Sequence, residues 1–502
     1  DGNTPLHSAC ECRTKDLPVL VKQLLSVDPQ GVAAKTKDRQ GNLPIHSAAE
    51  KKNPSADVVT MLIDANPKGL EQKDRDGNLP IHSCLENRFD FPTSLFEKML
   101  TLYPASTKVF DKDGNLPLHC AYHSYQGQQL VDITQLMLQV DSSAGVVKDK
   151  RFRQYLLHYI CQQNKPFALI EAFCKGCPKA VSLKDSGGNL PLHVMCERGD
   201  SSPVPVIQCL MFSYPDGIAV KDKDGNTPLH SACEKLHLNI SAVAGMMLDL
   251  KPEASKIKDR DGNLPLHSIC ESSTPATDVI MSLIEAYPEG LRQKDKTGNL
   301  PLHSAIERGD VLESIVLTKM IELHPEACKV KDKDGNTPLH SACECRTKDL
   351  PVLVKQLLSV DPQGVAAKTK DRQGNLPIHS ACERTFINLT SQPNPQPEVV
   401  MMLIKEYPNG LQQKDKEGNL PIHSSVERGD AGVDVAVIEK MLELNPGAMS
   451  VRDKQGNTPL HSACECLTIK LVAVLTAMLR AGPSAAKVKD RDGNLPLHCV
   501  CE

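Results

Sequence analysis

The sequence has no tryptophan and few other aromatic residues. Nine phenylalanines and eight tyrosines make up 3% of the 502 residues, so a hydrophobic core must be built mainly from aliphatic side chains, methionine and cysteine. An excess of charge of one sign is also missing, because 58 lysines and arginines nearly balance 62 aspartates and glutamates, for a formal net charge of −4. This balance argues against a broad nucleic-acid or anionic-membrane surface, although it is compatible with a local charged patch.

Long hydrophobic runs are absent as well. No run approaches the roughly 18 residues that cross a bilayer, so we expect a soluble chain without direct membrane insertion. The chain begins with Asp1 rather than methionine, and we expect it to be truncated at both ends, so the absence of a leader says little. The 19 cysteines are odd in number and lack the spacing of a small disulfide-bonded domain, which favours an intracellular, cytoplasmic location.

What the sequence does contain is an internal repeat. A Gly-Asn pair followed by leucine or threonine and then proline recurs thirteen times, at Gly2, Gly41, Gly77, Gly114, Gly188, Gly225, Gly262, Gly298, Gly335, Gly374, Gly418, Gly456 and Gly493. The steps are 36 to 39 residues, apart from one of 44 and one of 74 that contains a degenerate copy near residues 149–185. This periodicity predicts a single solenoid of about 13 to 14 repeats over residues 1–502.

Each repeat predicts the same order of elements. The proline after Gly-Asn-Leu suits the first turn of a helix, and that short helix reads Leu/Ile-His-Ser-Ala-Cys-Glu. A second helix with apolar residues at helical spacing, such as Val58, Met61 and Leu62, is expected to end at a proline such as Pro67. A polar Lys-Asp segment then leads to the next Gly-Asn as an extended hairpin.

The motifs TPLHSAC and LPLHSIC resemble the TPLHLAA signature of ankyrin repeats. The resemblance covers the whole chain and implies an all-α fold, an ankyrin-type helix-turn-helix plus β-hairpin repeat solenoid. Two features depart from the family pattern. The period of about 37 residues is longer than the usual value of about 33, and the Gly-Ala-Asp segment after the second helix is replaced by proline with glycine or alanine.

Several recurrent residues invite a catalytic or metal-binding interpretation. One histidine recurs in each of fourteen repeats, but residues about a helix diameter apart are too distant to share a metal ion, and in ankyrin repeats this histidine holds the turn. Most of the recurrent cysteines occupy a packing position. Arg-Gly-Asp occurs three times, at Arg198, Arg308 and Arg428, each time in the turn between two helices. We therefore expect no enzymatic activity, no cofactor and no metal.

The residue after the glycine raises a separate question about helix capping. Nine of the thirteen repeats carry leucine where ankyrin repeats have a capping threonine. We hypothesise that the preceding asparagine, for example Asn42, replaces the lost hydroxyl acceptor through an Asx-type turn.

The resemblance also implies which residues meet a partner. Ankyrin partners are usually met by the two residues after the hairpin aspartate, the residue after the glycine and two residues that end the first helix. In two repeats these positions are Arg39, Gln40, Asn42, Glu50 and Lys51, and Arg260, Asp261, Asn263, Glu271 and Ser272. The asparagine and the glutamate hardly vary among repeats, which is either structural or suited to an extended, repetitive partner.

Two regions break the uniformity. Seven of the seventeen phenylalanines and tyrosines lie between Tyr122 and Phe173, and the candidate partner-binding residues there are Tyr122, Tyr125, Arg151, Phe152, Arg153 and Tyr155. They form either an interface of aromatic and arginine anchors or the core of a drifted repeat. The second region, residues 384–398, is rich in proline and asparagine and is predicted to be a mobile insertion loop.

One long stretch of the sequence occurs twice. Residues 1–48 are identical to residues 334–381. A recent duplication, an assembly artefact and deliberate engineering are all compatible with this identity.

These features together predict a non-catalytic scaffold for protein–protein interaction. It binds protein partners, and not nucleic acid, on the concave face made by the hairpins and inner helices. The alternative is a regulatory or targeting arm of a larger enzyme or membrane protein whose functional domain lies outside this chain. A purely mechanical spacer is a third possibility.

Overall fold

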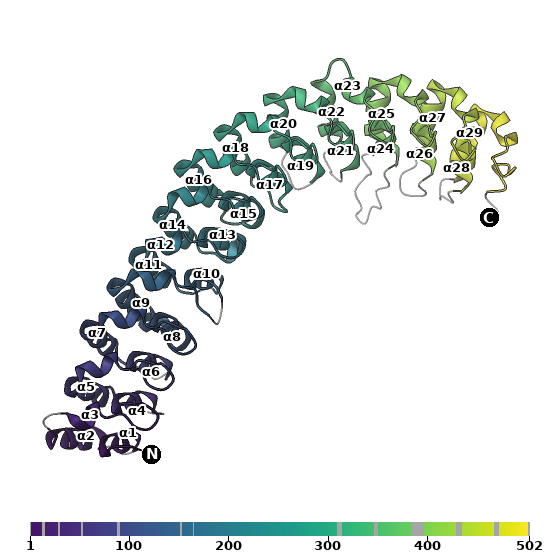
Figure 1. Cartoon of the computed structure of the whole chain (residues 1–502). Coiled ribbons are helices and arrows are strands. Elements are labelled where there is room, and N and C mark those ends of the chain that lie inside the picture. The colour runs from purple at the N-terminus through teal and green to yellow at the C-terminus, as the bar shows by residue number, and fades with distance from the viewer. Residues whose placement is uncertain are drawn as a thin grey trace. The chain divides into compact units, whose positions relative to one another are not determined.

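The computed structural model describes residues 2–12, 16–28, 31–51, 54–87, 91–150, 153–163, 165–308, 314–345, 350–383, 396–427, 434–465 and 471–499. The chain divides into two compact units, Asp1–Lys251 and Pro252–Glu502. Each unit is a stack of helix pairs (Figure 1). The predicted insertion at 384–398 lies outside the described residues, except for its last three positions, which begin helix α25 (Gln396–Glu406). The prediction of one continuous solenoid stays a prediction.

Seven helix pairs make up the described part of the first unit. The first helices are α1 (Pro5–Glu11), α4 (Pro44–Glu50), α6 (Pro80–Glu86), α8 (Pro117–Ser124), α10 (Leu156–Gln162), α13 (Pro191–Glu197) and α15 (Pro228–Lys235). The second helices are α2 (Leu17–Ser26), α5 (Ala56–Ala65), α7 (Thr93–Leu102), α9 (Gly127–Val140), α11 (Phe167–Gly176), α14 (Val204–Ser213) and α16 (Ile240–Leu250). Helix α10 lies within the sequence of the degenerate copy.

The second unit repeats this arrangement with six pairs in its described residues. Its first helices are α17 (Pro265–Glu271), α19 (Pro301–Glu307), α21 (Pro338–Glu344), α24 (Pro377–Glu383), α26 (Pro421–Val426) and α28 (Pro459–Glu465). Its second helices are α18 (Thr277–Ala286), α20 (Ser314–Leu323), α22 (Leu350–Ser359), α25, α27 (Val435–Leu444) and α29 (Leu471–Ala481). Within each unit the first helices form one layer and the second helices the other (Figure 1).

The prolines that follow the second helices have two roles. They end these helices as predicted, and many of them also begin a short 3-10 helix, such as η1 (Pro67–Glu71), η7 (Pro288–Arg292) and η10 (Pro408–Gln412). The twice-occurring segment has a four-residue α-helix instead, α3 (Val32–Lys35) and α23 (Val365–Lys368), each preceded by a glycine with positive φ. Part of the longer repeat length is therefore taken up by the short helix that follows the second helix.

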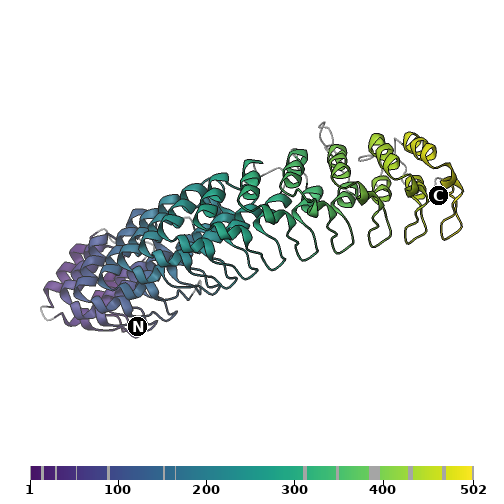
Figure 2. The same ribbon diagram turned by 90° about the horizontal axis from the view of Figure 1, so that it is seen from above.

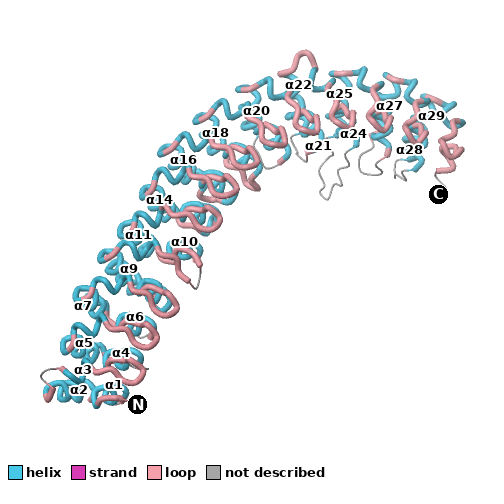
Figure 3. The backbone as a smooth tube through the Cα atoms, viewed as in Figure 1, coloured by secondary structure: helices cyan, strands magenta, loops and turns pink. Residues whose placement is uncertain are grey.

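The connections to the next first helix are turns rather than strands. No β-strand occurs among the described residues, where the only bridge of β type joins Lys148 and Tyr155 (Figure 3). A representative turn is closed by the Asp38 N–H, which donates to the Asn42 carbonyl at 3.0 Å. The helical part of the predicted fold class is confirmed, whereas its β-hairpins are not shown. In each unit the turns project from the same side of the helix pairs (Figure 2).

The first helices begin through the recurrent histidine. In α6, Pro80 occupies the first helical position and the Leu79 N–H donates to Nδ1 of His82 at 3.1 Å. Threonine repeats use the same bond and add a hydroxyl contact, as at Thr337 and His340, where the two side chains lie 2.9 Å apart. Leucine is tolerated at the capping position because the imidazole accepts the backbone N–H of that residue, which has no partner within the helix.

The hypothesis that asparagine replaces the capping hydroxyl is wrong. The side-chain Oδ1 atom accepts no hydrogen bond in six leucine repeats within the described residues, at Asn78, Asn115, Asn189, Asn299, Asn375 and Asn419. The Asx-type turn belongs to the aspartate four residues earlier, since Oδ1 of Asp38 accepts the N–H groups of Gln40 and Asn42, both at 2.8 Å.

The core is a thin layer of medium-sized side chains between the two helix layers. In α5, for example, Val58, Val59, Leu62 and Ile63 are all buried. Each repeat packs on its neighbours, so short-range contacts of this kind replace the large aromatic core of a globular domain. Among the described residues, none of the helices combines the length and apolar character that a membrane crossing requires.

Candidate partner-binding surface

The turn aspartate decides which side chains are presented at the tip of each turn. Asp38 is half-buried, and its carboxylate accepts the backbone N–H of Asn42 within the same turn. Gly41 has a φ of +83°, which turns the chain back toward α4. A side chain at Gly41 would be strained in that conformation. Arg39 and Gln40, which lie between these two fixed points, are exposed. The tip of the turn is therefore a regular platform for variable polar side chains.

In several repeats the recurrent histidine also contacts the backbone of the next repeat. Nε2 lies 3.0 Å from the Asn42 carbonyl at His7, 3.2 Å from the Asn226 carbonyl at His193, and 3.2 Å from the Asn375 carbonyl at His340. Burial lowers the pKa of His193 to about 4, as it does for His82, His267, His303, His379 and His423. These imidazoles are neutral near pH 7, and the predicted structural role of the histidine is confirmed.

Glutamates that end the first helices form an acidic row within each unit. Partial burial, followed by nearby aspartates such as Asp332, raises the pKa of Glu307 to about 7. Partial burial also raises the pKa of Glu50, Glu86, Glu197, Glu271 and Glu427. A serine of the following repeat donates to several of them, including Ser304 to Glu271 at 2.9 Å and Ser462 to Glu427 at 3.1 Å. The glutamates thus have a structural role in addition to being accessible.

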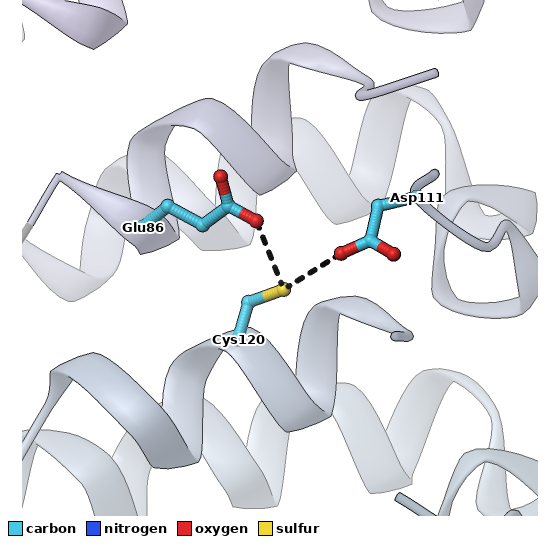
Figure 4. A group of neighbouring side chains, drawn as sticks. All are labelled: Glu86, Asp111 and Cys120. Atoms are coloured by element: carbon cyan, nitrogen blue, oxygen red, sulfur yellow. Dashed lines mark hydrogen bonds between the residues drawn. The ribbon is translucent and has the colours of Figure 1, made fainter. Parts of the chain in front are cut away.

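One site in this row has a thiol in place of the serine. Sγ of Cys120 lies 3.7 Å from Oε1 of Glu86 and 3.8 Å from Oδ2 of Asp111 (Figure 4). Burial and the two carboxylates raise the pKa of the Cys120 thiol far above its ordinary value, so the thiol stays protonated and donates a hydrogen bond. The trio has the residue types of a metal site, but its geometry matches the serine–glutamate contacts of other repeats.

The same repeat has a histidine where the glutamate usually ends the helix. Nε2 of His123 lies 3.0 Å from Oδ2 of Asp149, which is fully buried. Beside it, an open cavity of about 480 Å³ is lined by residues that include Glu86, Cys120, His123 and Lys150. The acidic row is therefore interrupted by a histidine in the repeat that precedes the degenerate copy.

No protein-family model and no curated protein matches the sequence. Among solved structures, the chain is similar to the crystal structure of the ankyrin repeat domain of Bcl-3, titled a unique member of the IkappaB protein family, with 20% sequence identity and a TM-score of 0.36. The match covers 51% of this chain and 100% of the other.

The repeating motif and the repeating helix pair decide the kind of fold. Each unit is built from TPLH-like starts followed by two packed helices. The chain is an ankyrin-like array of helical repeats.

Within this ankyrin-like array, the predicted binding residues of the second repeat belong to the turn before α4 and to the end of α4. Arg39, Gln40 and Glu50 are exposed, whereas Asn42 and Lys51 are half-buried. Nζ of Lys51 donates to the Cys12 carbonyl of the preceding repeat. Asn42 contributes its carbonyl to the histidine contact, so its position is structural as well as accessible.

The corresponding set in the second unit is similar. Arg260, Asp261 and Glu271 are exposed and Asn263 is half-buried, but Ser272 is buried and does not face solvent. The prediction for Ser272 is therefore corrected, and its hydroxyl oxygen accepts the Thr274 N–H at 3.4 Å.

The aromatic cluster of the ankyrin-like array is mostly core. Tyr122 and Tyr125 are only 7% and 3% exposed, so the expectation that these rings meet a partner is corrected. Tyr122 packs edge-on against Tyr159 with ring centroids 5.7 Å apart, and Tyr125 packs in the same way on Phe96 at 5.9 Å. These two rings fill the core beside the degenerate repeat, so the alternative interpretation as core residues holds for them.

The remaining residues of this cluster differ from the two tyrosines. Arg153 is exposed with a φ of +57°, and Tyr155 is half-buried with Nζ of Lys148 5.0 Å from its ring centroid. Arg151 and Phe152 lie outside the described residues. Arg153 takes the place of the usual glycine, a substitution that costs backbone strain.

The first Arg-Gly-Asp tripeptide, Arg198 to Asp200, forms hydrogen bonds to the next repeat. Oδ1 of Asp200 accepts the N–H groups of His237 and Leu238 at 2.9 and 2.8 Å, and Gly199 has a φ of +64°. These contacts confirm the interpretation as a turn at Arg198. Arg308 ends its helix within the described residues, whereas the other two residues of that copy and Arg428 lie outside them.

A row of lysines was not recognised from the sequence as anything beyond a solvated face. Nζ of Lys37 donates to the Lys73 carbonyl at 3.0 Å, and Nζ of Lys184 donates to the Lys221 carbonyl at 2.6 Å. Each bond crosses to the next repeat. The regular Lys-Asp spacing was the available signal, but the carbonyl acceptor depends on how neighbouring turns stack.

Proposed function

We propose that this chain is a non-catalytic scaffold that binds protein partners on the side formed by its turns and first helices. The observation that supports this proposal most is the bonding between neighbouring turns. The Lys112 N–H donates to the Asp76 carbonyl at 3.1 Å, and the Lys454 N–H donates to the Glu417 carbonyl at 2.8 Å. Stacked turns of this kind hold exposed side chains at fixed positions, which lowers the entropy lost when a partner binds.

The residues that vary between repeats lie at the exposed tips of the turns, where selective binding of a partner requires variation. The turn aspartate, the glycine and the histidine recur and are structural, whereas the exposed tip position is glutamine at Gln40, aspartate at Asp76 and threonine at Thr297. Rigid backbone with variable exposed side chains is the arrangement that supports selective recognition. The proposed binding residues are Arg39, Gln40, Asn42, Glu50, Lys51, Arg260, Asp261, Asn263, Glu271 and the exposed Arg153.

Site-specific photo-cross-linking tests the proposal. A photoreactive amino acid is placed at Gln40 or Asp261 on the turns, and at Lys22 or Lys405 on the exposed side of second helices as matched controls. We expect discrete protein adducts in extracts of the source cells from the turn positions and few from the helix positions. Adducts that are equally abundant at all four positions, or absent from the turns, would contradict it. An intracellular location and the lack of nucleic-acid binding stay predictions.

A further inference from the structure

Each turn of the second unit has two basic residues, one before and one after the turn aspartate. The pairs are Lys258 and Arg260, Lys294 and Lys296, Lys331 and Lys333, Lys370 and Arg372, Lys414 and Lys416, Arg452 and Lys454, and Lys489 and Arg491. The first unit lacks this continuity, because Phe110 and Ser186 interrupt it. Even with the turn aspartates and the acidic tip residues counted, these turns have a small excess of positive charge in a chain whose net charge is −4.

In five of the seven pairs, the side chain of the first residue is held in place by the next repeat. Nζ donates to the backbone carbonyl of the next repeat from Lys258, Lys294, Lys331, Lys370 and Lys414, at distances of 2.6 to 2.9 Å. Each of these bonds uses one of the three N–H donors of an ammonium group. The turn aspartate is bonded within its own turn, since Oδ1 of Asp332 accepts the N–H groups of Asp334 and Asn336.

The second residue of each pair contacts the tip of the preceding turn. The Lys333 N–H donates to the Thr297 carbonyl at 2.8 Å, and the Arg372 N–H donates to the Asp334 carbonyl at 2.7 Å. The identity of the preceding tip residue therefore decides whether the base has an acidic neighbour. In the second unit this tip alternates between acidic and neutral, as Asp261, Thr297, Asp334, Gln373, Glu417, Gln455 and Asp492.

Between Lys333 and Arg491 the ion pairs follow this alternation, whereas Lys296, which follows the acidic tip Asp261, forms no ion pair within the part of the chain that the structure describes. Arg372 lies 3.7 Å from Asp334, and Lys454 lies 3.8 Å from Glu417. Lys333 and Lys416, which follow Thr297 and Gln373, form no ion pair with any described residue and are exposed. Every second turn from Lys333 to Arg491 therefore presents a base that has no ion pair to the preceding tip, although acidic residues flank it in the sequence.

We propose that these alternate bases, with the lysines beside them, bind an extended acidic segment of a partner protein. The segment places carboxylates at Lys333, Lys416 and Arg491 and skips the turns whose bases are already paired. If neighbouring repeats are about 8 to 10 Å apart, binding positions two repeats apart are separated by roughly 16 to 20 Å, which about five or six extended residues span. This inference rests on the proposed function and adds the chemistry of the partner.

A polypeptide fits this pattern better than a nucleic acid does. Each strand of a double helix carries about one phosphate per 3.4 Å, so phosphates would also fall against Asp334 and Glu417. A polypeptide can instead place neutral residues opposite those carboxylates. The alternation thus favours partners by the spacing of their negative charges as well as by the number of those charges.

The test uses the full chain and defined peptides in about 150 mM salt, where exposed charges farther apart than about 8 Å are screened. The probe is a labelled 24-residue peptide with Glu-Glu pairs every six residues in a glycine–serine background, and binding is measured by fluorescence anisotropy. We expect the double variant Lys333→Gln, Lys416→Gln to weaken binding by about three- to tenfold, as two exposed ion pairs would. The control Lys355→Gln, Lys405→Gln removes the same charge from exposed positions on second helices and should change binding less than about twofold.

The tip acids provide the opposite test. Neutralising them in Asp334→Asn, Glu417→Gln should strengthen binding of a peptide whose glutamate pairs recur every three residues more than binding of the six-residue peptide. Equal weakening by the two double lysine variants would overturn the proposal, as would tighter binding of a single-stranded oligothymidine that is lost in the same variant. If cross-linking identifies a partner on the turns but the peptides fail, this inference falls while the proposed scaffold function stands.

Discussion

The same 48 residues occur at two places in this chain and have different surroundings. Both copies form the same helices, α1 to α3 in one and α21 to α23 in the other. They also share a detailed contact, since an aspartate Oδ2 accepts the Ala33 N–H at 2.6 Å in one copy and the Ala366 N–H at 2.7 Å in the other. Secondary structure and turn geometry are therefore properties of the segment itself.

The burial of an equivalent side chain, in contrast, depends on the repeats that pack against it. Leu20 of α2 is 37% exposed, whereas the equivalent Leu353 of α22 is 5% exposed. Helix α22 packs against α20 of the preceding repeat, where Nε2 of Gln356 donates to Oγ1 of Thr318 at 2.8 Å. The comparison teaches that each repeat encodes its own shape but only half of its core, as in a linear array with nearest-neighbour coupling.

Truncating the equivalent leucine in the two copies should give the largest difference. We expect Leu353→Ala to destabilise its region by about 2 to 5 kcal/mol because it leaves a cavity, and Leu20→Ala to cost less than about 1 kcal/mol. Urea unfolding followed by circular dichroism measures both. Equal losses would mean that neighbour packing does not distinguish the copies.

Acidification should reveal the histidine contact that both copies share. His379 has a pKa of about 4 in the folded chain and about 6.5 when unfolded, so the unfolded state binds more protons between these values and the stability that this histidine contributes falls as the pH drops through them. The free-energy advantage of His379 over a His379→Gln variant should shrink by up to about 3 kcal/mol from pH 7.5 to pH 4. An advantage that is constant with pH would show that the ring is not buried as a neutral base.

Adding a neighbour to the first copy should remove part of the difference. Fusing a second copy of residues 297–333 ahead of Asp1 gives Leu20 the packing surface that Leu353 has. We expect this to stabilise α2 by about 1 kcal/mol, the value for partial burial of one leucine side chain. Limited proteolysis between α1 and α2 measures the effect, with a fused unrelated domain as the control. No added protection would contradict the neighbour account.

Exchanging the helix cap should have the smallest effect. Thr337→Leu loses the hydroxyl contact to His340 but keeps the bond from the backbone N–H to Nδ1, so we expect a loss below about 1 kcal/mol. Thr4→Leu in the other copy should behave alike, since Oγ1 of Thr4 lies 2.7 Å from Nδ1 of His7. A loss of several kcal/mol in thermal unfolding would mean that the hydroxyl, and not the histidine, is the essential cap.

Much of the fold could be predicted from the sequence because its signals are local. Pro80, His82 and Gly77 fix a helix start and a turn within a few residues, and they recur at each period. The candidate surface was predictable in part for the same reason, as the exposed Arg39 and Gln40 show. What failed depended on contacts between repeats. Tyr122 is buried because Tyr159 of the next repeat packs on it, and no spacing within one repeat reveals such a contact.

Hydrogen exchange of the two identical segments in one molecule tests the central claim most directly. The exposed Lys355 is first replaced by arginine, so that peptides from α2 and α22 differ in mass. If neighbours supply half of each repeat's core, amides of α2 should exchange at least about tenfold faster than those of α22, which corresponds to about 1.4 kcal/mol in opening free energy. Equal exchange rates in the two helices would contradict the account.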